Sequence, residues 1–110
     1  MPQRENRQNE YYDAHYGIVS VGLTSTGVVV VATTQGNYHG IAMIASAASI
    51  IAKVYDASVG TTGNMVDVIQ VGVTGTGWSD KYIPLVCRKG ITVSITGSGG
   101  AGCIFFGPKG

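Results

Sequence analysis

The sequence predicts an all-β protein: an antiparallel β-sandwich or jelly roll of seven or eight short strands, with an extended N-terminal arm. The composition carries this prediction. Val, Ile and Thr occur 14, 10 and 10 times and Leu only twice, and β-branched side chains fit a pleated sheet better than a helix. The 17 glycines supply the turns that many short strands require. With 110 residues, the chain is long enough for one domain with a single core.

Short apolar segments separated by turn residues define the expected strands. They are predicted at residues 18–23, 28–32, 41–45, 50–55, 65–74, 81–87, 91–96 and 103–106. The clearest is ITVSIT at 91–96, where apolar and polar residues alternate strictly, as in a half-buried antiparallel strand. In 50–55, Ile50, Ala52 and Val54 share one face.

The connections contain glycine and polar residues. Loops or turns are expected for QGNYHG at 35–40, GTGWSD at 75–80 and GSGG at 97–100, because glycine, asparagine, serine and aspartate favour turn conformations. Asp56 and Asp80 occupy positions typical of turn-forming aspartates. The alanines and serines of IAMIASAASIIA, at 41–52, leave a short helix open as an alternative to a strand there.

The stretch GSGGAG at 97–102 has the glycine spacing of a dinucleotide-binding turn. That motif requires a helix after the glycines and an acidic residue about 20 positions further on. Only eight residues follow Gly102, and they read CIFFGPKG. We therefore expect a hairpin loop and no nucleotide cofactor.

Residues 1–17 form the expected N-terminal arm, and residues 18–110 the sandwich domain. The arm is polar and carries five of the chain's 13 charged residues and three of its six tyrosines. Two interpretations stand: a disordered terminus, or an arm that becomes ordered on a partner with tyrosines as anchors. The residues expected to bind the partner are Arg4, Arg7, Tyr11, Tyr12 and Tyr16.

Charge and hydropathy argue against several functional classes. The net charge of +1 and the lack of a basic cluster argue against nucleic-acid binding. The longest apolar run has 12 residues, too few to span a bilayer, and the polar N-terminus does not resemble a signal peptide. The few charges after the arm suggest a body that hides surface in an oligomer or a larger assembly.

Catalytic and metal-binding groups are scarce. His15 lies in the arm near Asp13, and His39 in a predicted loop, where a surface or interface role is the commoner one. No carboxylate pair or metal-ligand cluster can be assembled from the spacing. The sequence therefore predicts no enzyme activity and no metal or other cofactor.

The two cysteines, Cys87 and Cys103, are expected to be buried free thiols. If residues 91–96 form the strand between them, they are about 9–10 Å apart, beyond the roughly 7 Å that a disulfide allows between Cα atoms. If the chain instead crosses between strands as in a Greek key, the two cysteines could be brought together, and this argument would not apply.

Three aromatic residues are candidates for a ligand site or an interface: Tyr38, His39 and Trp78. Trp78 is the sole tryptophan. It is interpreted either as a loop aromatic that folds back over the end of the sandwich, or as a stacking platform for a sugar or an interface anchor.

Residues 50–106 resemble small structural proteins of tailed bacteriophages. The similarity lies in AKVYDASVGTTGNMVDVIQV at 52–71 and KYIPLVCRKGITVSITGSGGAGCIFF at 81–106. These segments are similar to head decoration (cement) proteins and to related β-sandwich modules of head fibres and spikes. The resemblance implies a non-enzymatic virion component, made in the bacterial cytoplasm, that binds the major capsid protein and clamps neighbouring coat subunits. It also implies a homo-oligomer, with a trimer favoured. The alternative is a receptor- or glycan-binding module of a fibre or spike, acting through Tyr38, His39 and Trp78.

Overall fold

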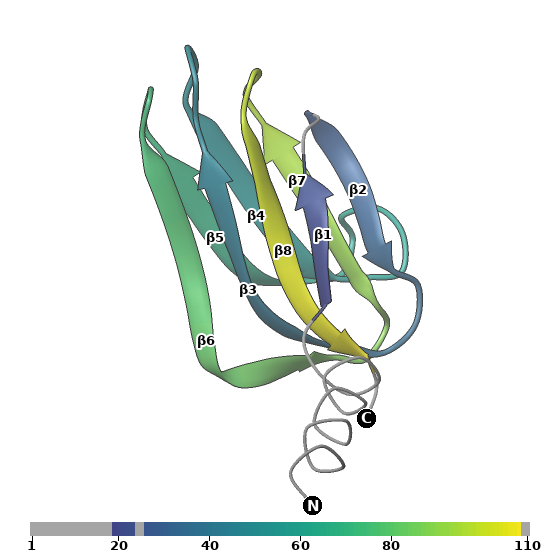
Figure 1. Cartoon of the computed structure of the whole chain (residues 1–110). Coiled ribbons are helices and arrows are strands. Elements are labelled where there is room, and N and C mark those ends of the chain that lie inside the picture. The colour runs from purple at the N-terminus through teal and green to yellow at the C-terminus, as the bar shows by residue number, and fades with distance from the viewer. Residues whose placement is uncertain (1–18, 24–25, 109–110) are drawn as a thin grey trace, which may run out of the picture.

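The computed structural model describes residues 19–23 and 26–108, and within them the chain forms eight strands and no helix (Figure 1). The strands are β1 (Val19–Leu23), β2 (Gly27–Ala32), β3 (Gly36–Ile44), β4 (Ile50–Asp56), β5 (Asn64–Val71), β6 (Thr76–Cys87), β7 (Ile91–Thr96) and β8 (Ala101–Pro108). The predicted arm, residues 1–17, lies outside the described residues. Within the described ranges there is no helix of the length and apolarity that a membrane span requires.

The strands form two four-stranded antiparallel sheets packed face to face (Figure 1). Sheet A has the order β1-β8-β3-β6 and sheet B the order β2-β7-β4-β5. This is the strand order of an eight-stranded jelly roll, in which each sheet contains strands from both halves of the chain. The predicted fold class is therefore confirmed. β1 and β6 are the edge strands of sheet A, and β2 and β5 those of sheet B.

The core lies between the sheets and follows the alternation of the sequence. The inward residues of β4 and β7, which include Ile50, Val54 and Val93, are fully buried, as the alternation predicted. Burial of each such side chain contributes about 1.5–3 kcal/mol to stability. The other buried apolar residues include Leu23, Tyr38, Ile41, Met43, Ala52, Ile69, Val71, Cys87, Ile91, Ile95 and Ile104. Thr92 is the one buried polar residue of the described chain, and its hydroxyl donates to the Ala57 carbonyl at 2.9 Å.

Two predicted loops are strands, and these predictions were wrong. Residues 36–40 belong to β3, and 76–80 belong to β6, where Asp80 pairs with Gly40 rather than forming a turn. A Cβ on Gly40 would lie 2.3 Å from the Ser79 carbonyl oxygen. This glycine therefore permits close approach of two strands, a role that glycine takes inside sheets as well as in turns. The helix considered for 41–52 does not form either, because 36–44 is paired on both sides.

The GSGG segment connects two strands, but the predicted hairpin was wrong, because β7 lies in sheet B and β8 in sheet A and the two do not pair. Both Gly97 (φ 107°) and Gly99 (φ 78°) of this crossing adopt left-handed conformations. A side chain would strain the backbone at both positions.

An irregularity interrupts the pairing of β3. Tyr38 and Gly40 pair with the consecutive residues Phe106 and Phe105 of β8, so His39 is one extra residue, a β-bulge. On the other side of β3, the same two residues pair with Leu85 and Asp80 of β6. Residues 81–84 of β6 therefore form an excursion opposite His39. β6 bends sharply in its lower half (Figure 1).

Candidate functional site

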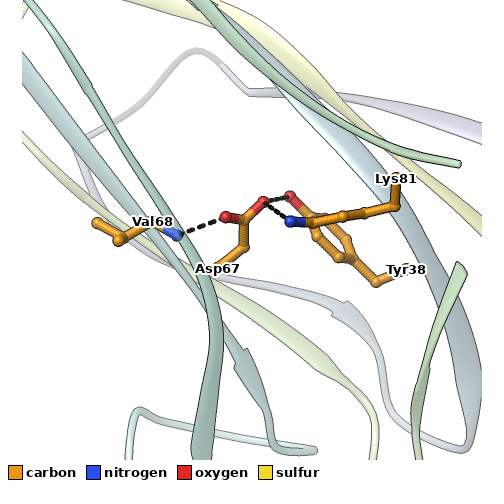
Figure 2. A network of polar contacts seen from close by, with 4 residues as sticks. All are labelled: Tyr38, Asp67, Val68 and Lys81. Carbon is orange, nitrogen blue, oxygen red and sulfur yellow. Dashed lines mark hydrogen bonds and ion pairs between the residues drawn. The ribbon is translucent and has the colours of Figure 1, made fainter. Parts of the chain in front are cut away.

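A polar cluster joins the two sheets where the edge strands β5 and β6 face each other. The Tyr38 hydroxyl donates to Asp67 Oδ2 at 2.7 Å, and Lys81 Nζ lies 3.7 Å from the same oxygen. The backbone N–H of Val68 donates to Asp67 Oδ1 at 2.9 Å. Figure 2 shows the phenol and the ammonium converging on one carboxylate. Tyr38 comes from β3 and Lys81 from β6, both in sheet A, whereas Asp67 comes from β5 in sheet B.

The strand alternation places these groups inside the sandwich. Asp67 pairs with the buried Val54, so its side chain points inward from the edge strand β5, and only 11% of it is exposed. The Lys81 side chain is 30% exposed. Inward charges on edge strands discourage pairing with another chain, because they would be stranded if the edge were extended.

The carboxylate of Asp67 is stabilised by its neighbours. Burial acts to raise its pKa, but polar contacts with Ser79, Tyr38 and the Val68 amide, together with the charge of Lys81, outweigh burial and lower the pKa below its ordinary value. Asp67 is therefore an anion in the folded protein at neutral pH.

The phenol of Tyr38 is held in its neutral form. Burial, followed by the hydrogen bond to Asp67 and its negative charge, raises the pKa of Tyr38 above its ordinary value of 10.0. Tyr38 is thus a hydrogen-bond donor and not a base. The groups of the cluster satisfy one another and connect sheet A to sheet B, and we call this contact the inter-sheet lock.

The three aromatic candidates do not converge on one site. Tyr38 is fully buried and points into the core. Trp78 is 72% exposed and pairs with Ala42 on the opposite, outer face of sheet A. His39 is half-buried at the bulge of β3, three positions from Ala42. The five partner-binding candidates of the arm lie outside the described residues.

Several large apolar side chains are exposed on β6. Besides Trp78, this strand exposes Tyr82 (98%), Ile83 (74%) and Val86 (51%). Sequence analysis singled out only Trp78, because it placed 81–87 in a strand but did not establish which strands lie at a sheet edge. The sequence feature that could have indicated an edge strand is Pro84. Proline lacks an N–H and is found within sheets at edges or bulges.

The two cysteines are free, as predicted. The prediction placed residues 91–96 (β7) between the two cysteines, but the strand between them is β3 of sheet A. The prediction of free thiols is right, and the strand used to argue it was wrong. Cys87 is fully buried, but Cys103 is half-buried rather than buried. Burial and, to a smaller extent, the charge of Asp56 raise the pKa of Cys87 to about 11, which makes it an unreactive thiol at neutral pH.

The described part of the chain contains no candidate metal centre. No three or more His, Cys, Asp or Glu side chains are grouped there to hold a metal ion. No protein-family model and no curated protein matches the chain. The candidate functional features are therefore the inter-sheet cluster and the exposed side chains of sheet A.

Proposed function

We propose that this protein is a structural component of a virion, a capsid decoration or cement protein that binds the head surface and clamps neighbouring coat subunits. The proposal combines the resemblance of residues 50–106 to such proteins with a jelly-roll sandwich, an architecture common in capsid proteins and lectins. Because one fold serves many functions, the fold alone does not carry the proposal.

The observation that carries it is the exposure of large apolar side chains on a sheet. Trp78, Tyr82 and Ile83 are each more than two-thirds exposed, and soluble monomers rarely gather such residues without using them. Tryptophan and tyrosine are the residues that most often dominate protein interfaces. These surfaces favour a protein that works through contacts.

The inter-sheet cluster supports a non-enzymatic role. Tyr38, Asp67 and Lys81 are engaged with one another, and their effect is to fix sheet A against sheet B. A rigid body with contact surfaces is what a clamp between coat subunits requires. On this proposal, Arg4, Arg7 and the arm tyrosines contact the major capsid protein, and several weak contacts act together through effective concentration.

A receptor- or glycan-binding module is the second candidate. It is favoured by one observation: the Trp78 side chain stands exposed on a strand face, where its ring is accessible for stacking on a sugar. Binding of the full chain to a glycan array, lost in Trp78→Ala and kept in Tyr55→Phe, would support this candidate.

Immunogold electron microscopy of virus particles from the source of the sequence tests the proposal. An antibody against this chain should label the head surface evenly. Label at a fibre or tail tip would transfer the proposal to the receptor-binding candidate. Particles that carry no label would contradict both.

Variants of the full chain then test the role of the arm. Recombinant protein is added to heads that lack it, and bound protein is measured after sedimentation. Replacing Tyr11, Tyr12 and Tyr16 together by Ser should reduce binding at least tenfold, because three anchors are lost. Lys53→Ser is the control and should bind as the wild type does. Equal binding by both variants would remove the arm from the proposed contact.

A further inference from the structure

The outer face of sheet A is defined by the side chains that point away from the core on its four strands. The pairing register arranges them in rows across the sheet. From β6 to β1, one row contains Trp78, Ala42, Cys103 and Gly22, and the next contains Asp80, Gly40, Phe105 and Ser20. Except for Gly40, all of these residues are exposed or half-buried.

Side-chain size changes systematically along the first row. At the β6 end the Trp78 indole is 72% exposed. At the β1 end, a Cβ placed on Gly22 would meet no atom of the described residues within 4 Å. One edge of the face thus carries a projecting ring, and the other edge carries bare backbone at the same level.

We propose that a second copy of this chain covers the outer face of sheet A through a two-fold contact. The axis runs parallel to the strands, midway between the two central strands β3 and β8. This rotation places β6 of one copy opposite β1 of the other. Each row of side chains then lies against the same row of the second copy, with its order reversed. Two sheets packed in this aligned manner lie about 10 Å apart.

Within each row, the residues that face each other across the contact are complementary in size or in hydrogen bonding. In the first row, Trp78 faces Gly22 of the second copy, which leaves room for the indole. In the second row, the Phe105 ring faces Gly40, which has no side chain. The Ser20 hydroxyl faces the Asp80 carboxylate and is a suitable donor to it. Each contact occurs twice, as a two-fold interface requires.

The distribution of charged residues favours the outer face of sheet A over that of sheet B as the dimer contact. In sheet A the central strands β3 and β8 direct no Asp, Glu, Lys or Arg outward, and Asp80 lies on an edge strand. In sheet B, Lys53 is exposed on the central strand β4, opposite Ser94 of β7. Covering that face would bury an ammonium group without a carboxylate partner, which is costly.

The area of this face determines how tightly two copies are expected to bind each other. Four strands about five residues long cover roughly 19 by 17 Å, and a rugged surface of that footprint gives on the order of 500–600 Å² per copy, near the lower limit of specific interfaces. The pair should therefore dissociate on dilution. The contact uses Trp78, one of the exposed residues on which the proposed function rests. It produces dimers, whereas the trimer implied by the resemblance needs a head-to-tail contact.

Sedimentation equilibrium of the full chain across a dilution series tests the proposal. The wild type should reach twice the 11.4 kDa chain mass at high concentration. Gly22→Arg places a long cation where the Trp78 ring of the second copy would lie. Each copy should still fold, because the described residues leave open space around Gly22. This variant should dimerise at least about tenfold more weakly.

Val28→Arg is the matched control. It adds the same charge to the edge strand of the other sheet, at a position that is 53% exposed, and should dimerise as the wild type does. Trp78→Ala removes the same contact from the opposite side and should behave like Gly22→Arg. A monomer at every concentration, a mass of three chains, or equal dimerisation by Gly22→Arg and Val28→Arg would overturn the proposal.

Cross-linking gives a second readout through a native thiol. In the pair, the two Cys103 Cα atoms lie roughly 11 Å apart across the axis, given the usual strand and sheet spacings, within reach of a short bismaleimide. The wild type and Val28→Arg should form cross-linked dimers, whereas Gly22→Arg should not. Labelling with a monofunctional maleimide, at a dilution at which all three proteins are monomers, checks that the thiol is equally reactive in all three. Equal cross-linking in all three would contradict the pairing.

Discussion

The two sheets of this sandwich share one core but present different outer faces. Sheet A carries Trp78 at one edge and Gly22 at the other, with Ala42 and Cys103 between them. Sheet B carries the exposed Lys53 on a central strand. Both inner faces are mostly apolar because they fill the core, and their main polar feature is the shared Tyr38–Asp67–Lys81 cluster. The difference between the outer faces is therefore the more informative about interactions.

The largest effect is expected where sheet A is held together. A Cβ on Gly102 would lie 2.0 Å from the Ala42 carbonyl oxygen, whereas one on Gly22 meets no described atom within 4 Å. Gly102→Ala should therefore destabilise the fold by about 3 kcal/mol or more, and Gly22→Ala by less than about 0.5 kcal/mol. Urea unfolding measures both, and equal stability of the two variants would contradict the close approach of β8 to β3.

Removing the lock between the sheets should have the next largest effect. Tyr38→Phe deletes the hydroxyl that donates to Asp67, and the loss should cost about 1–3 kcal/mol because the buried carboxylate loses a donor. Tyr82→Phe is the control, since that side chain is 98% exposed. If both variants unfold at the same urea concentration as the wild type, the cluster does not join the sheets.

A charge placed in the centre of sheet A should make its outer face resemble that of sheet B. Ala42→Lys is expected to weaken the proposed dimer at least about tenfold and to leave the monomer folded, because the new ammonium can reach water. The reciprocal change, Lys53→Ser, should not alter dimerisation through sheet A. Sedimentation equilibrium measures both. Dimerisation of Ala42→Lys at the wild-type concentration would show that charge does not distinguish the faces.

The pKa values of Asp67, in the inter-sheet cluster, and of the buried Cys87 thiol predict how the free energy of unfolding changes with pH. The lowered pKa of Asp67 gives stability that is present above the ordinary Asp value and is lost as pH falls through the folded value. The pKa of Cys87, raised to about 11 from 9.0, gives the opposite sign: stability is complete below pH 9 and falls as pH rises towards 11.

Two variants separate these effects. Asp67→Asn should flatten the acid side of the stability profile, and Cys87→Ala should flatten the alkaline side between pH 9 and 10, above which the raised pKa of Tyr38 also lowers stability. The slope assigned to Cys87 has an upper limit of about 1.4 kcal/mol per pH unit. Urea midpoints measured from pH 2 to 11 provide the test. Profiles parallel to that of the wild type would rule out these groups as the source.

The sequence predicted most of the fold because the clearest strands alternate strictly. Residues 91–96 show an uninterrupted period of two, and the structure confirms them as β7. The prediction failed at 36–40 and 76–80, where glycine accompanies close strand packing. A glycine that allows a tight approach, such as Gly40, looks the same in sequence as one that forms a turn.

The functional features were less accessible to prediction. The lock joins Tyr38 to Asp67, 29 residues away, and depends on which strands the two sheets bring face to face. The exposure of Tyr82 follows from the position of β6 at a sheet edge. Local periodicity does not contain strand order, so these features required the structure.

The most direct test of the sheet A contact exchanges its two complementary ends. Gly22→Trp and Trp78→Gly are each expected to lose the dimer, because the first places two rings against each other and the second leaves a gap. The double variant Gly22→Trp/Trp78→Gly reverses the row and restores a ring opposite a glycine in a two-fold pair. Sedimentation equilibrium should therefore show a dimer for the double variant and monomers for both single variants. A folded double variant that remains monomeric would contradict the proposed contact.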